Sequence, residues 1–479
     1  MAATLIDNAS FIIAFDGTGH RYLRNGRLAF EGDTILFVGR HYDGPVEKVI
    51  DARGKVVSPG FVDTHIHMQE SVLDRSFVEV GGPPELGFDT LIDFLMPRSR
   101  VMDPAIRRVC TEYSLGEVLR SGATTCVEIG ESVDDLVDLV PRYGNRIFFA
   151  PGFNSAAWQG GEGSAVGYVW KADEGFGELE RAVASIRELD GEFGGLMNGM
   201  LSPWQADTCT ERLLHRTREW ADELAVPLTI HAAQSEYEVS NMVARTGKTP
   251  IAWLADIGFL ARDVLVAHAI YLSGTRYTDL PPGDIEILAG TGASVAHSPW
   301  VFGRDGMALD SFARYQRAGI NMTLGTDTCP QNMIQAMRLA SVFSKSVEGS
   351  PAATTGADVF NAATLGGARA LGRDDLGRLC AGAKADIVIF SGMNMVPLRD
   401  PVNNIVFSAE MEDVETVIVN GRTVVGHGEV LGSSDRAAEL CAAVQRAAEE
   451  VWGRLPGEDR MGRTVDEISP PSFDDWPAE

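Results

Sequence analysis

Residues 249–269 read TPIAWLADIGFLARDVLVAHA, which predicts a helix followed directly by a continuous apolar strand. The same order of helix and strand recurs at residues 104–129, 208–232, 284–299 and 310–327. Repeated units of this kind indicate a parallel sheet covered on both faces, because such strands are buried on both sides. A closed barrel and an open doubly wound sheet both satisfy the pattern. In the unit of residues 208–232, Thr208 and Glu211 have the spacing of a capping box and predict a helix start.

The two ends of the chain follow another pattern. Residues 1–58 and 385–430 consist of short strand-like runs separated by turn residues, without helical periodicity. We therefore predict one small β domain built from both ends, with the α/β unit of residues 59–384 inserted into it. Residues 431–479 begin as a helix and continue as an acidic tail that contains proline.

Composition restricts the class of protein. The chain has 479 residues, of which 45% are hydrophobic and 23% charged, so we expect a globular protein with a sizeable core rather than a disordered or fibrous one. With 41 Lys and Arg against 67 Asp and Glu, the formal charge of −26 disfavours nucleic acid and anionic membranes as partners. The six cysteines are scattered, and the sequence shows neither a basic leader nor a long apolar run. We expect a cytoplasmic protein with reduced thiols.

Five of the nine histidines fall at or beside the ends of predicted strands: His65, His67, His231, His268 and His297. The His-x-His pair directs both rings to one side, because side chains alternate faces along a strand. A lone histidine at such a place is more often a core residue than a ligand. However, the carboxyl ends of parallel barrel strands meet at one face, where these rings would converge.

Asp327 adds a carboxylate at the end of the strand in NMTLGTD. One alternative is that it caps a following helix. Three imidazoles and one carboxylate would leave a metal ion room for a bound water, as hydrolytic metal sites require. In that arrangement Asp327 could act as the general base.

An ordered series of motifs resembles the amidohydrolase superfamily, in the branch of the s-triazine hydrolases, guanine deaminase and related deaminases. The resemblance covers about residues 1–430. Its motifs are PGFVDTHIH (59–67), SGATT (121–125), TCTERLL (208–214), IHAA (230–233), VAHAIYL (266–272), DIEILAGTGASVAHSP (284–299), LGTDTCPQNM (324–333), ATLGGARALG (363–372), LGRLCAGAKADIVIF (376–390) and VIVNG (417–421).

This resemblance implies a (β/α)8 barrel inserted in a small β-sandwich, with one divalent metal ion in the barrel. The implied ligands are His65, His67, His231 and Asp327, and His268 would contact the attacking water. Zinc is favoured, and iron(II) is the alternative. The mononuclear type is favoured because residues 195–204, the candidate fourth strand, contain no lysine that could bridge two metals.

One position departs from the pattern of the related deaminases. They carry a glutamate three residues after the histidine of the fifth strand, where it protonates the substrate ring, whereas this chain has Gln234. An amide cannot supply that proton. Glu236 could replace the acid, Asp327 and His268 could manage all proton transfers, or the substrate could need no acid there. Gln234 and Glu236 are therefore candidate catalytic residues beside Asp327 and His268.

The candidate substrate-binding residues are His297, Trp300, Phe302 and Gln69. Trp300 and Phe302 form an aromatic wall, with Arg304 close behind, that would suit a flat heteroaromatic molecule. The alternative is that both rings only pack between barrel and helix. We also expect a small-molecule substrate as the partner and a homo-oligomer, a dimer or larger.

The leading hypothesis is a metal-dependent amidohydrolase of the deaminase type, which hydrolyses a carbon–nitrogen bond on a nitrogen heteroaromatic small molecule. The alternative on the same scaffold is hydrolysis of an amide, urea or carbamate, which Gln234 supports. Less favoured are a non-haem iron oxygenase, since His and Asp also bind Fe(II), and a metal-binding homologue without activity.

Overall fold

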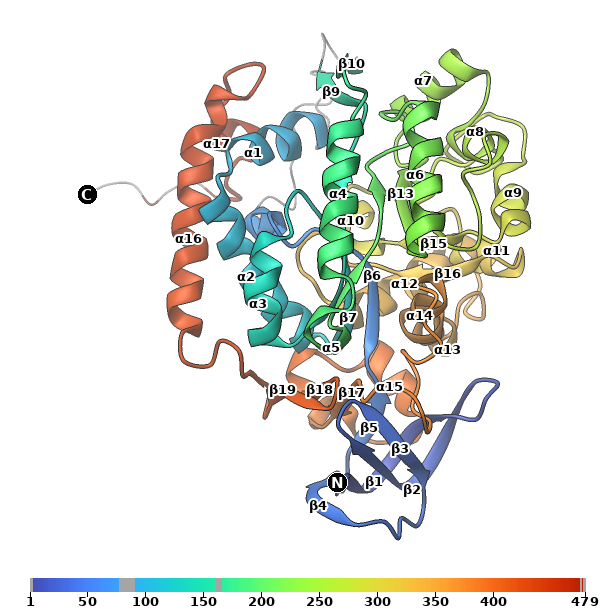
Figure 1. The fold of residues 1–479 in the computed structure, drawn as a ribbon, viewed down its shortest axis with the longest axis vertical. Helices are drawn as coiled ribbons and strands as arrows, with labels where there is room; N and C mark the ends of the chain where they lie inside the picture. The colour runs from blue at the N-terminus through green and yellow to red at the C-terminus, as the bar shows by residue number, and fades with distance from the viewer. Residues whose placement is uncertain (1–2, 77–90, 161–165, 474–475, 477–479) are drawn as a thin grey trace.

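The structure is a computed structural model that describes residues 3–76, 91–160, 166–473 and 476. Within these ranges, parallel strands close into a barrel, and a β-sandwich lies at one end of it (Figure 1). The predicted (β/α)8 barrel and the sandwich made from both chain ends are confirmed. The proposed boundaries at residues 58, 384 and 430 fall at or next to strands of the sandwich.

Eight strand positions form the barrel in the described part of the chain. They are β6 (Phe61–Ile66), β7 (Ala123–Gly130), β8 (Arg146–Phe153), β11 (Met197–Gly199) with β12 (Ser202–Pro203), β13 (Leu228–Ala232), β14 (Val264–His268), β15 (Ser294–His297) and β16 (Asn321–Leu324). Neighbouring strands pair in parallel. Parallel bridges from Leu201 to Leu228 and from Ile66 to Asp327 join the two partial sheets. The second bridge closes the barrel, which decides against an open sheet.

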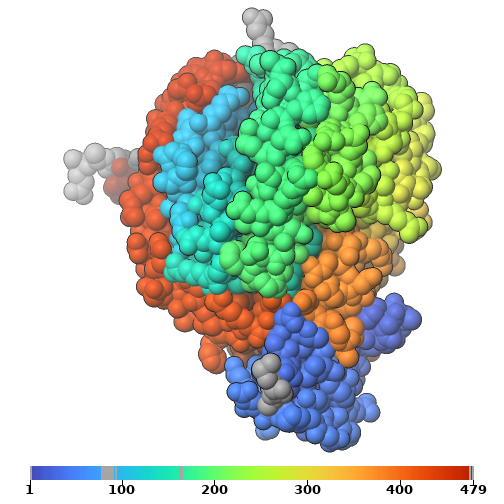
Figure 2. All heavy atoms as spheres, viewed as in Figure 1, coloured from blue at the N-terminus to red at the C-terminus, as the bar shows by residue number. Residues whose placement is uncertain are grey.

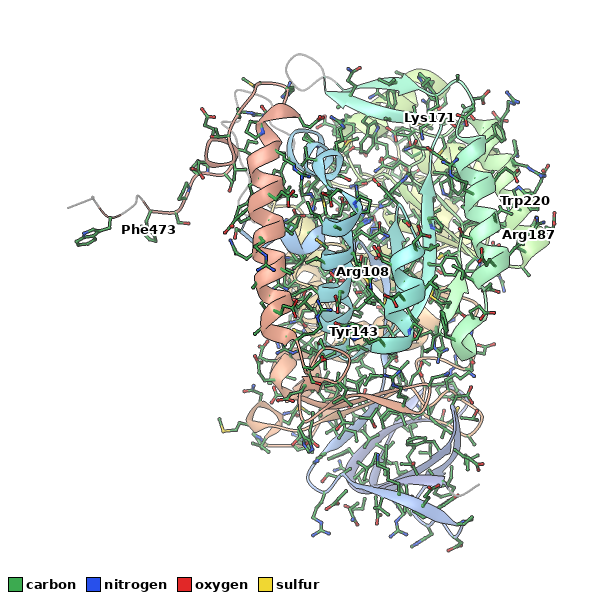
Figure 3. The ribbon with its side chains drawn as sticks, turned by 60° about the vertical axis from the view of Figure 1, so that its left-hand side comes forward. Arg108, Tyr143, Lys171, Arg187, Trp220 and Phe473 are labelled. Carbon is green, nitrogen blue, oxygen red and sulfur yellow. The ribbon has the colours of Figure 1, made fainter. Side chains whose placement is uncertain are left out.

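Helices surround the barrel and follow the strands in alternation. They are α1 (Met96–Val101), α2 (Pro104–Arg120), α3 (Asp134–Tyr143), α4 (Phe176–Leu189), α5 (Glu192–Gly195), α6 (Glu211–Leu224), α7 (Glu236–Thr246), α8 (Pro250–Asp256), α9 (Asp284–Thr291), α10 (Pro299–Gly303), α11 (Phe312–Arg317), α12 (Met333–Glu348), α13 (Gly356–Asn361), α14 (Gly367–Ala370) and α15 (Pro401–Phe407). Short helical turns are η1 (Ser71–Ser76), η3 (Leu91–Leu95), η4 (Ala362–Gly366), η5 (Met393–Met395) and η6 (Met411–Asp413). A hairpin of β9 (Ala156–Gly160) and β10 (Val166–Trp170) follows β8. On the outer surface, Arg187 of α4 lies over the ring of Trp220 of α6, 4.7 Å from its centroid (Figure 3).

Local sequence signals explain where the helices begin. Asp103 caps α2 by accepting hydrogen bonds from the backbone of Ala105 and Ile106, and Pro104 occupies the first helical position. The capping box predicted from Thr208 to Glu211 is wrong. Thr210 caps α6, because its hydroxyl accepts from the backbone of Leu213 and it directly precedes the first helical residue.

The sandwich is one nine-stranded sheet that draws strands from both chain ends. Its strands are β1 (Ala3–Phe15), β2 (His20–Glu31), β3 (Thr34–Gly39), β4 (Val46–Asp51), β5 (Val56–Pro59), β17 (Ile387–Phe390), β18 (Val414–Val419), β19 (Arg422–Gly426) and β20 (Glu429–Val430). The two halves join where β5 pairs antiparallel with β17, with Pro59 opposite Ile387. In Figure 2 the N-terminal strands form a lobe at one end of the molecule.

A buried ion pair ties the barrel to the sandwich. The Nε and Nη2 of Arg146, at the start of β8, both donate to the carboxylate of Asp386 at 3.1 Å. The side chains of the two residues are 0% and 3% exposed. Arg146 also donates to Asn420 and to the carbonyl of Gly195. The guanidinium is therefore satisfied inside the protein, as a buried charge requires.

The C-terminal segment packs against the barrel. Helix α16 (Ala437–Arg454) lies along α2, where Val451 and Ala448 are buried beside Ile106. The turn η7 (Leu455–Gly457) and α17 (Val465–Ile468) follow, and Phe473 lies clear of the body (Figure 3). No helix in the described ranges is long and apolar enough to cross a membrane.

Candidate metal centre and its cavity

Four histidines and one aspartate meet at the carboxyl ends of the barrel strands. His65 lies in β6, and His67 follows that strand directly. His231 lies near the end of β13, His268 ends β14, and Asp327 follows β16 by three residues. The sequence places them on different strands, and barrel closure brings those strand ends to one face.

The potential ligand atoms form two overlapping groups that share His65. The atoms of His65, His231 and His268 lie within 4.8 Å of one another, and so do those of His65, His67 and Asp327. From the carboxylate of Asp327, the Nε2 atoms of His67, His65 and His268 are 3.6, 3.8 and 3.8 Å away. This spacing can accommodate one divalent ion with nitrogen and oxygen ligands.

Backbone carbonyls orient two of the imidazoles. The Nδ1 of His67 lies 2.8 Å from the carbonyl oxygen of Ile129, and the Nδ1 of His231 lies 2.6 Å from that of Trp204. A carbonyl only accepts, so both Nδ1 atoms carry the proton and both Nε2 atoms keep a free lone pair. Such outer contacts fix the tautomer in metal sites. The ring of Trp204 also stacks near His67 and His231, with centroids 6.0 Å from each.

The unpartnered ring nitrogens and the protonation state of the histidines also suit a metal ion. His65 is fully buried, and neither of its ring nitrogens has a hydrogen-bond partner in the part of the chain that the structure describes. Burial, together with neighbouring histidines, lowers the pKa of His65 well below its usual value, and burial lowers that of His231 to about 3. The imidazoles of His65 and His231 are therefore neutral near pH 7, which is the form that binds metal. An unpartnered buried nitrogen is costly unless a ligand satisfies it, and a metal ion would do so.

Two residues of the centre have a strained backbone. Asp327 has a φ of 62° and His268, at the end of β14, has a φ of 75°. Both values lie in the left-handed region that non-glycine residues rarely adopt. Buried Asp63 accepts hydrogen bonds from the backbone and hydroxyl of Thr326 and from the backbone of His65. One carboxylate thus ties two segments that present candidate ligands. Burial raises the pKa of Asp327, and the positive charge of Arg304 opposes this increase.

A cavity of about 1580 Å³ opens over these residues. Six of the sequence-predicted substrate and acid–base residues line it: Gln69, Gln234, Glu236, His268, Phe302 and Asp327. The rings of Phe302 and His268 form a T-shaped pair, with the centroids 4.8 Å apart. Both ends of the Gln69 amide bind backbone, since its nitrogen donates to Ser132 and its oxygen accepts from Glu131.

The two other predicted substrate-binding residues, His297 and Trp300, are not among the described residues that line the cavity. His297 is buried, with its ring 6.2 Å from that of Phe312, and burial lowers its pKa to about 3. Trp300 donates its indole N–H to the carbonyl of Cys329, in the loop after Asp327. Both side chains therefore pack behind the wall in this structure, and a substrate contact for either stays a proposal.

The sequence-based reasoning missed Gln205, which lies beyond the fourth barrel strand and lines the cavity. Its Nε2 donates to Oε1 of Gln234 at 2.9 Å, while its own Oε1 is buried and has no hydrogen-bond partner among the described residues. In the sequence, Gln205 directly follows the candidate fourth strand, at the end of SPWQ (202–205). This position could have identified it as a cavity residue. Glu238, also missed, accepts from the backbone of Ala233 and Gln234 and so fixes their loop.

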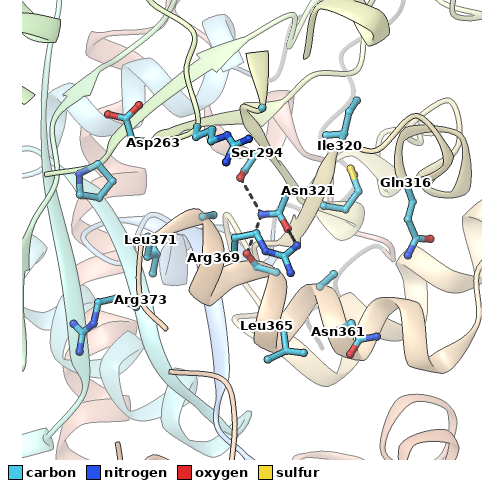
Figure 4. A pocket seen from close by; sticks show the side chains of 18 of the residues that line it. Asp263, Ser294, Gln316, Ile320, Asn321, Asn361, Leu365, Arg369, Leu371 and Arg373 are labelled. Atoms are coloured by element: carbon cyan, nitrogen blue, oxygen red, sulfur yellow. Dashed lines mark hydrogen bonds between the residues drawn. The ribbon is translucent and has the colours of Figure 1, made fainter. Parts of the chain in front are cut away.

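A second cavity of about 1510 Å³ lies at the opposite end of the barrel strands (Figure 4). There, Asn321 donates to Ser294 and to the carbonyl of Gly366, and it accepts from Arg369. These polar groups satisfy one another. In barrels of this type the amino ends of the strands serve stability, and the opposite face carries the chemistry.

The comparisons with known proteins agree with this geometry. The model of the amidohydrolase family matches residues 56–424. The chain belongs to the amidohydrolase family. The predicted family and fold are therefore confirmed, and the metal-dependent hydrolase inferred from the sequence is consistent with them.

Two amidohydrolase relatives cover most of the chain. A 5′-deoxyadenosine deaminase from Methanosarcina barkeri is 28% identical over 461 residues, covering 95% of this chain and 100% of the relative. A 5-methylthioadenosine/S-adenosylhomocysteine deaminase from Thermococcus kodakarensis is 31% identical, covering 83% of this chain and 89% of the relative.

Two solved structures share the amidohydrolase fold of this chain. An adenosine deaminase from Xanthomonas campestris with bound zinc superimposes with a TM-score of 0.80 at 24% identity, covering 94% of this chain and 98% of that one. A triazine hydrolase of Arthrobacter aurescens gives a TM-score of 0.77 at 21% identity, covering 94% and 100%. At these identities the likeness concerns the fold.

Proposed function

We propose that this amidohydrolase is a metal-dependent deaminase of purine nucleosides modified at the 5′ position. The observation that carries the proposal is the convergence of His65, His67, His231, His268 and Asp327. The last four of these residues also line one cavity. Relatives at 28–31% identity are named as deaminases of 5′-deoxyadenosine and of 5-methylthioadenosine and S-adenosylhomocysteine. These names support the same substrate class here.

His65, His67, His231 and Asp327 are the proposed ligands of one divalent ion, with zinc favoured and iron(II) as the alternative. Zinc in the superimposed Xanthomonas deaminase supports that preference. When bound, such an ion supplies a Lewis acid that lowers the pKa of a bound water toward neutrality.

The side chains around the metal centre transfer the proton, bind the attacking oxygen and hold the substrate ring. Asp327 accepts the proton of the attacking water, and His268, whose Nε2 lies 3.8 Å from that carboxylate, hydrogen-bonds the attacking oxygen. Gln234 holds the ring by donating from its Nε2, since its Oε1 already accepts from Gln205. Water adds to the ring carbon, ammonia leaves, and the proton taken by Asp327 is returned to the departing amine.

An assay of ammonia release tests the proposal. The zinc-loaded protein should deaminate 5′-deoxyadenosine and 5′-methylthioadenosine to the corresponding inosine derivatives, which absorb at a different wavelength. Oxygen-independent turnover would exclude an oxygenase. Tight zinc binding without turnover of any purine nucleoside would contradict the proposal.

A second candidate function is hydrolysis of an amide, urea or carbamate, and the observation that favours it is Gln234. The amide of Gln234 is tied to Gln205 and cannot protonate a ring nitrogen. A carbonyl substrate needs no such proton at that position. Release of amine from aryl ureas or carbamates, with no ammonia from purine nucleosides, would favour this candidate. The predicted homo-oligomer stays a proposal beside either function.

A further inference from the structure

One buried carboxylate holds the β9–β10 hairpin against the barrel. This hairpin lies at the end of the barrel opposite the sandwich (Figure 1), and its Trp158 lines the cavity. Trp158 and Tyr168 are directly opposite each other across the two strands. The indole N–H of Trp158 and the hydroxyl of Tyr168 both donate to Oδ2 of Asp207, at 2.8 and 2.7 Å. Asp207 is fully buried, so a single side chain fixes both strands from inside the protein.

Asp207 belongs to a short loop, residues 204–207, that supports the candidate metal centre. The carbonyl of Trp204, at the start of this loop, accepts from the Nδ1 of His231 at 2.6 Å. The Nε2 of Gln205, two residues before Asp207, donates to Oε1 of Gln234. The loop therefore orients one proposed metal ligand and the side chain that is proposed to hold the substrate ring, and Asp207 connects it to the hairpin.

A second buried carboxylate fixes the backbone on the other side of the amide pair. Glu238 accepts from the backbone N–H groups of Ala233 and Gln234, both at 2.8 Å. Burial raises the pKa of Glu238, and the charge of Asp207 raises it further, so the two carboxyl groups lie within electrostatic reach of each other. Two neighbouring buried acids cost free energy, and such acids are enriched at functional sites.

We propose that Asp207 is a positioning residue for the deamination, which holds the Gln205–Gln234 pair in place by anchoring residues 204–207 to the hairpin; this inference rests on the proposed function. Asp207 and Tyr168 are not among the described residues that line the cavity, so neither contacts the substrate in this arrangement. Their effect passes through Gln205 and through the carbonyl of Trp204. Because a displacement of about 1 Å can cost about 10²-fold in rate, a loosened loop should lower kcat.

Steady-state kinetics of the zinc-loaded protein with 5′-deoxyadenosine test the proposal. Tyr168→Phe removes one donor to Asp207 but keeps the ring, so kcat should fall about tenfold and KM should change less. Asp207→Ala should lower kcat about 10²-fold, and Asp207→Asn should restore most of it, because an amide oxygen still accepts both hydrogen bonds. Tyr22→Phe is the matched control, since it removes a hydroxyl that donates to Asp400 at 2.5 Å in the sandwich region, and it should keep the wild-type kcat. If the wild type is active and neither Tyr168→Phe nor Asp207→Ala lowers kcat, the positioning role is overturned.

Hydrogen–deuterium exchange separates failure of this inference from failure of the proposed function, because it needs no turnover. Tyr168→Phe should speed exchange about tenfold at the backbone amides of Ala206 and Gln234, which donate to His231 and Glu238. The control Tyr22→Phe should leave these amides unchanged, and urea denaturation checks that both variants stay folded. If no purine nucleoside is deaminated and the proposed function fails, faster exchange still supports the connection through Asp207. Unchanged exchange at both amides overturns the inference whether or not deamination occurs.

Discussion

The side chains of Gln205 and Gln234 form an amide pair at the cavity wall, in which Nε2 of Gln205 donates to Oε1 of Gln234 at 2.9 Å. Gln205 also forms a parallel bridge with His231, so the pair lies next to a proposed metal ligand. A neutral pair can hold a substrate ring but cannot protonate it. A deaminase with a carboxylic acid at this position can protonate the substrate ring from there, whereas this chain has to supply that proton from another group.

Gln234→Glu should raise the deamination rate, because a carboxylic acid there can protonate the ring nitrogen during attack. A positioned general acid contributes about 10²–10⁴-fold, so we expect kcat to rise about tenfold or more, with a new fall at alkaline pH. The pH profile of kcat is the measurement. Gln205→Glu is the matched control, because it places the same carboxyl group on the other side chain of the amide pair. A Gln234→Glu variant no faster than wild type would assign protonation to Asp327 and His268.

His65→Ala and Asp327→Ala should each lower kcat/KM by about 10³-fold or more, since each removes a proposed ligand and the second also removes the proposed base. Metal analysis should show loss of zinc from His65→Ala, and circular dichroism should show an intact fold. Removing metal with a chelator should abolish wild-type activity, and adding zinc should restore it. Full activity in a metal-free Asp327→Ala preparation would refute the assigned roles.

Arg146→Met should destabilise the protein by about 3–5 kcal/mol, because it leaves the buried carboxylate of Asp386 without its partner. Urea denaturation gives the free energy of unfolding. The double variant Arg146→Met/Asp386→Leu should recover part of the loss, since neither charge then remains buried alone. If the double variant is less stable than Arg146→Met, the ion pair is not the source of the effect.

His20 predicts a pH dependence of stability that is independent of the metal centre. Burial, followed by the charge of Arg378, lowers its pKa from 6.5 to about 4. The folded state therefore binds fewer protons than the unfolded state between these values, so stability is full above pH 6.5 and falls as the pH drops toward 4. The loss at pH 5 is about 2 kcal/mol. His20→Gln should reduce the difference in unfolding free energy between pH 7.5 and pH 5 by that amount, and an unchanged difference would contradict this origin.

The sequence was sufficient for the strand-end histidines and Asp327, because parallel strands of one barrel must present their carboxyl ends together. It was not sufficient for Trp300, whose aromatic character suggested a pocket wall. The backbone carbonyl of Cys329, which accepts its N–H, lies in another loop, and no pattern around residue 300 encodes that contact.

The pairing of Pro59 with Ile387 has a consequence during synthesis on the ribosome. The edge of β5 that receives β17 stays unpaired until the entire barrel has been translated, and an open strand edge is a site of aggregation. The N-terminal strands therefore depend on a late segment for protection. We expect nascent chains that stall before residue 390 to require a chaperone, whereas stalling after β18 leaves this edge covered.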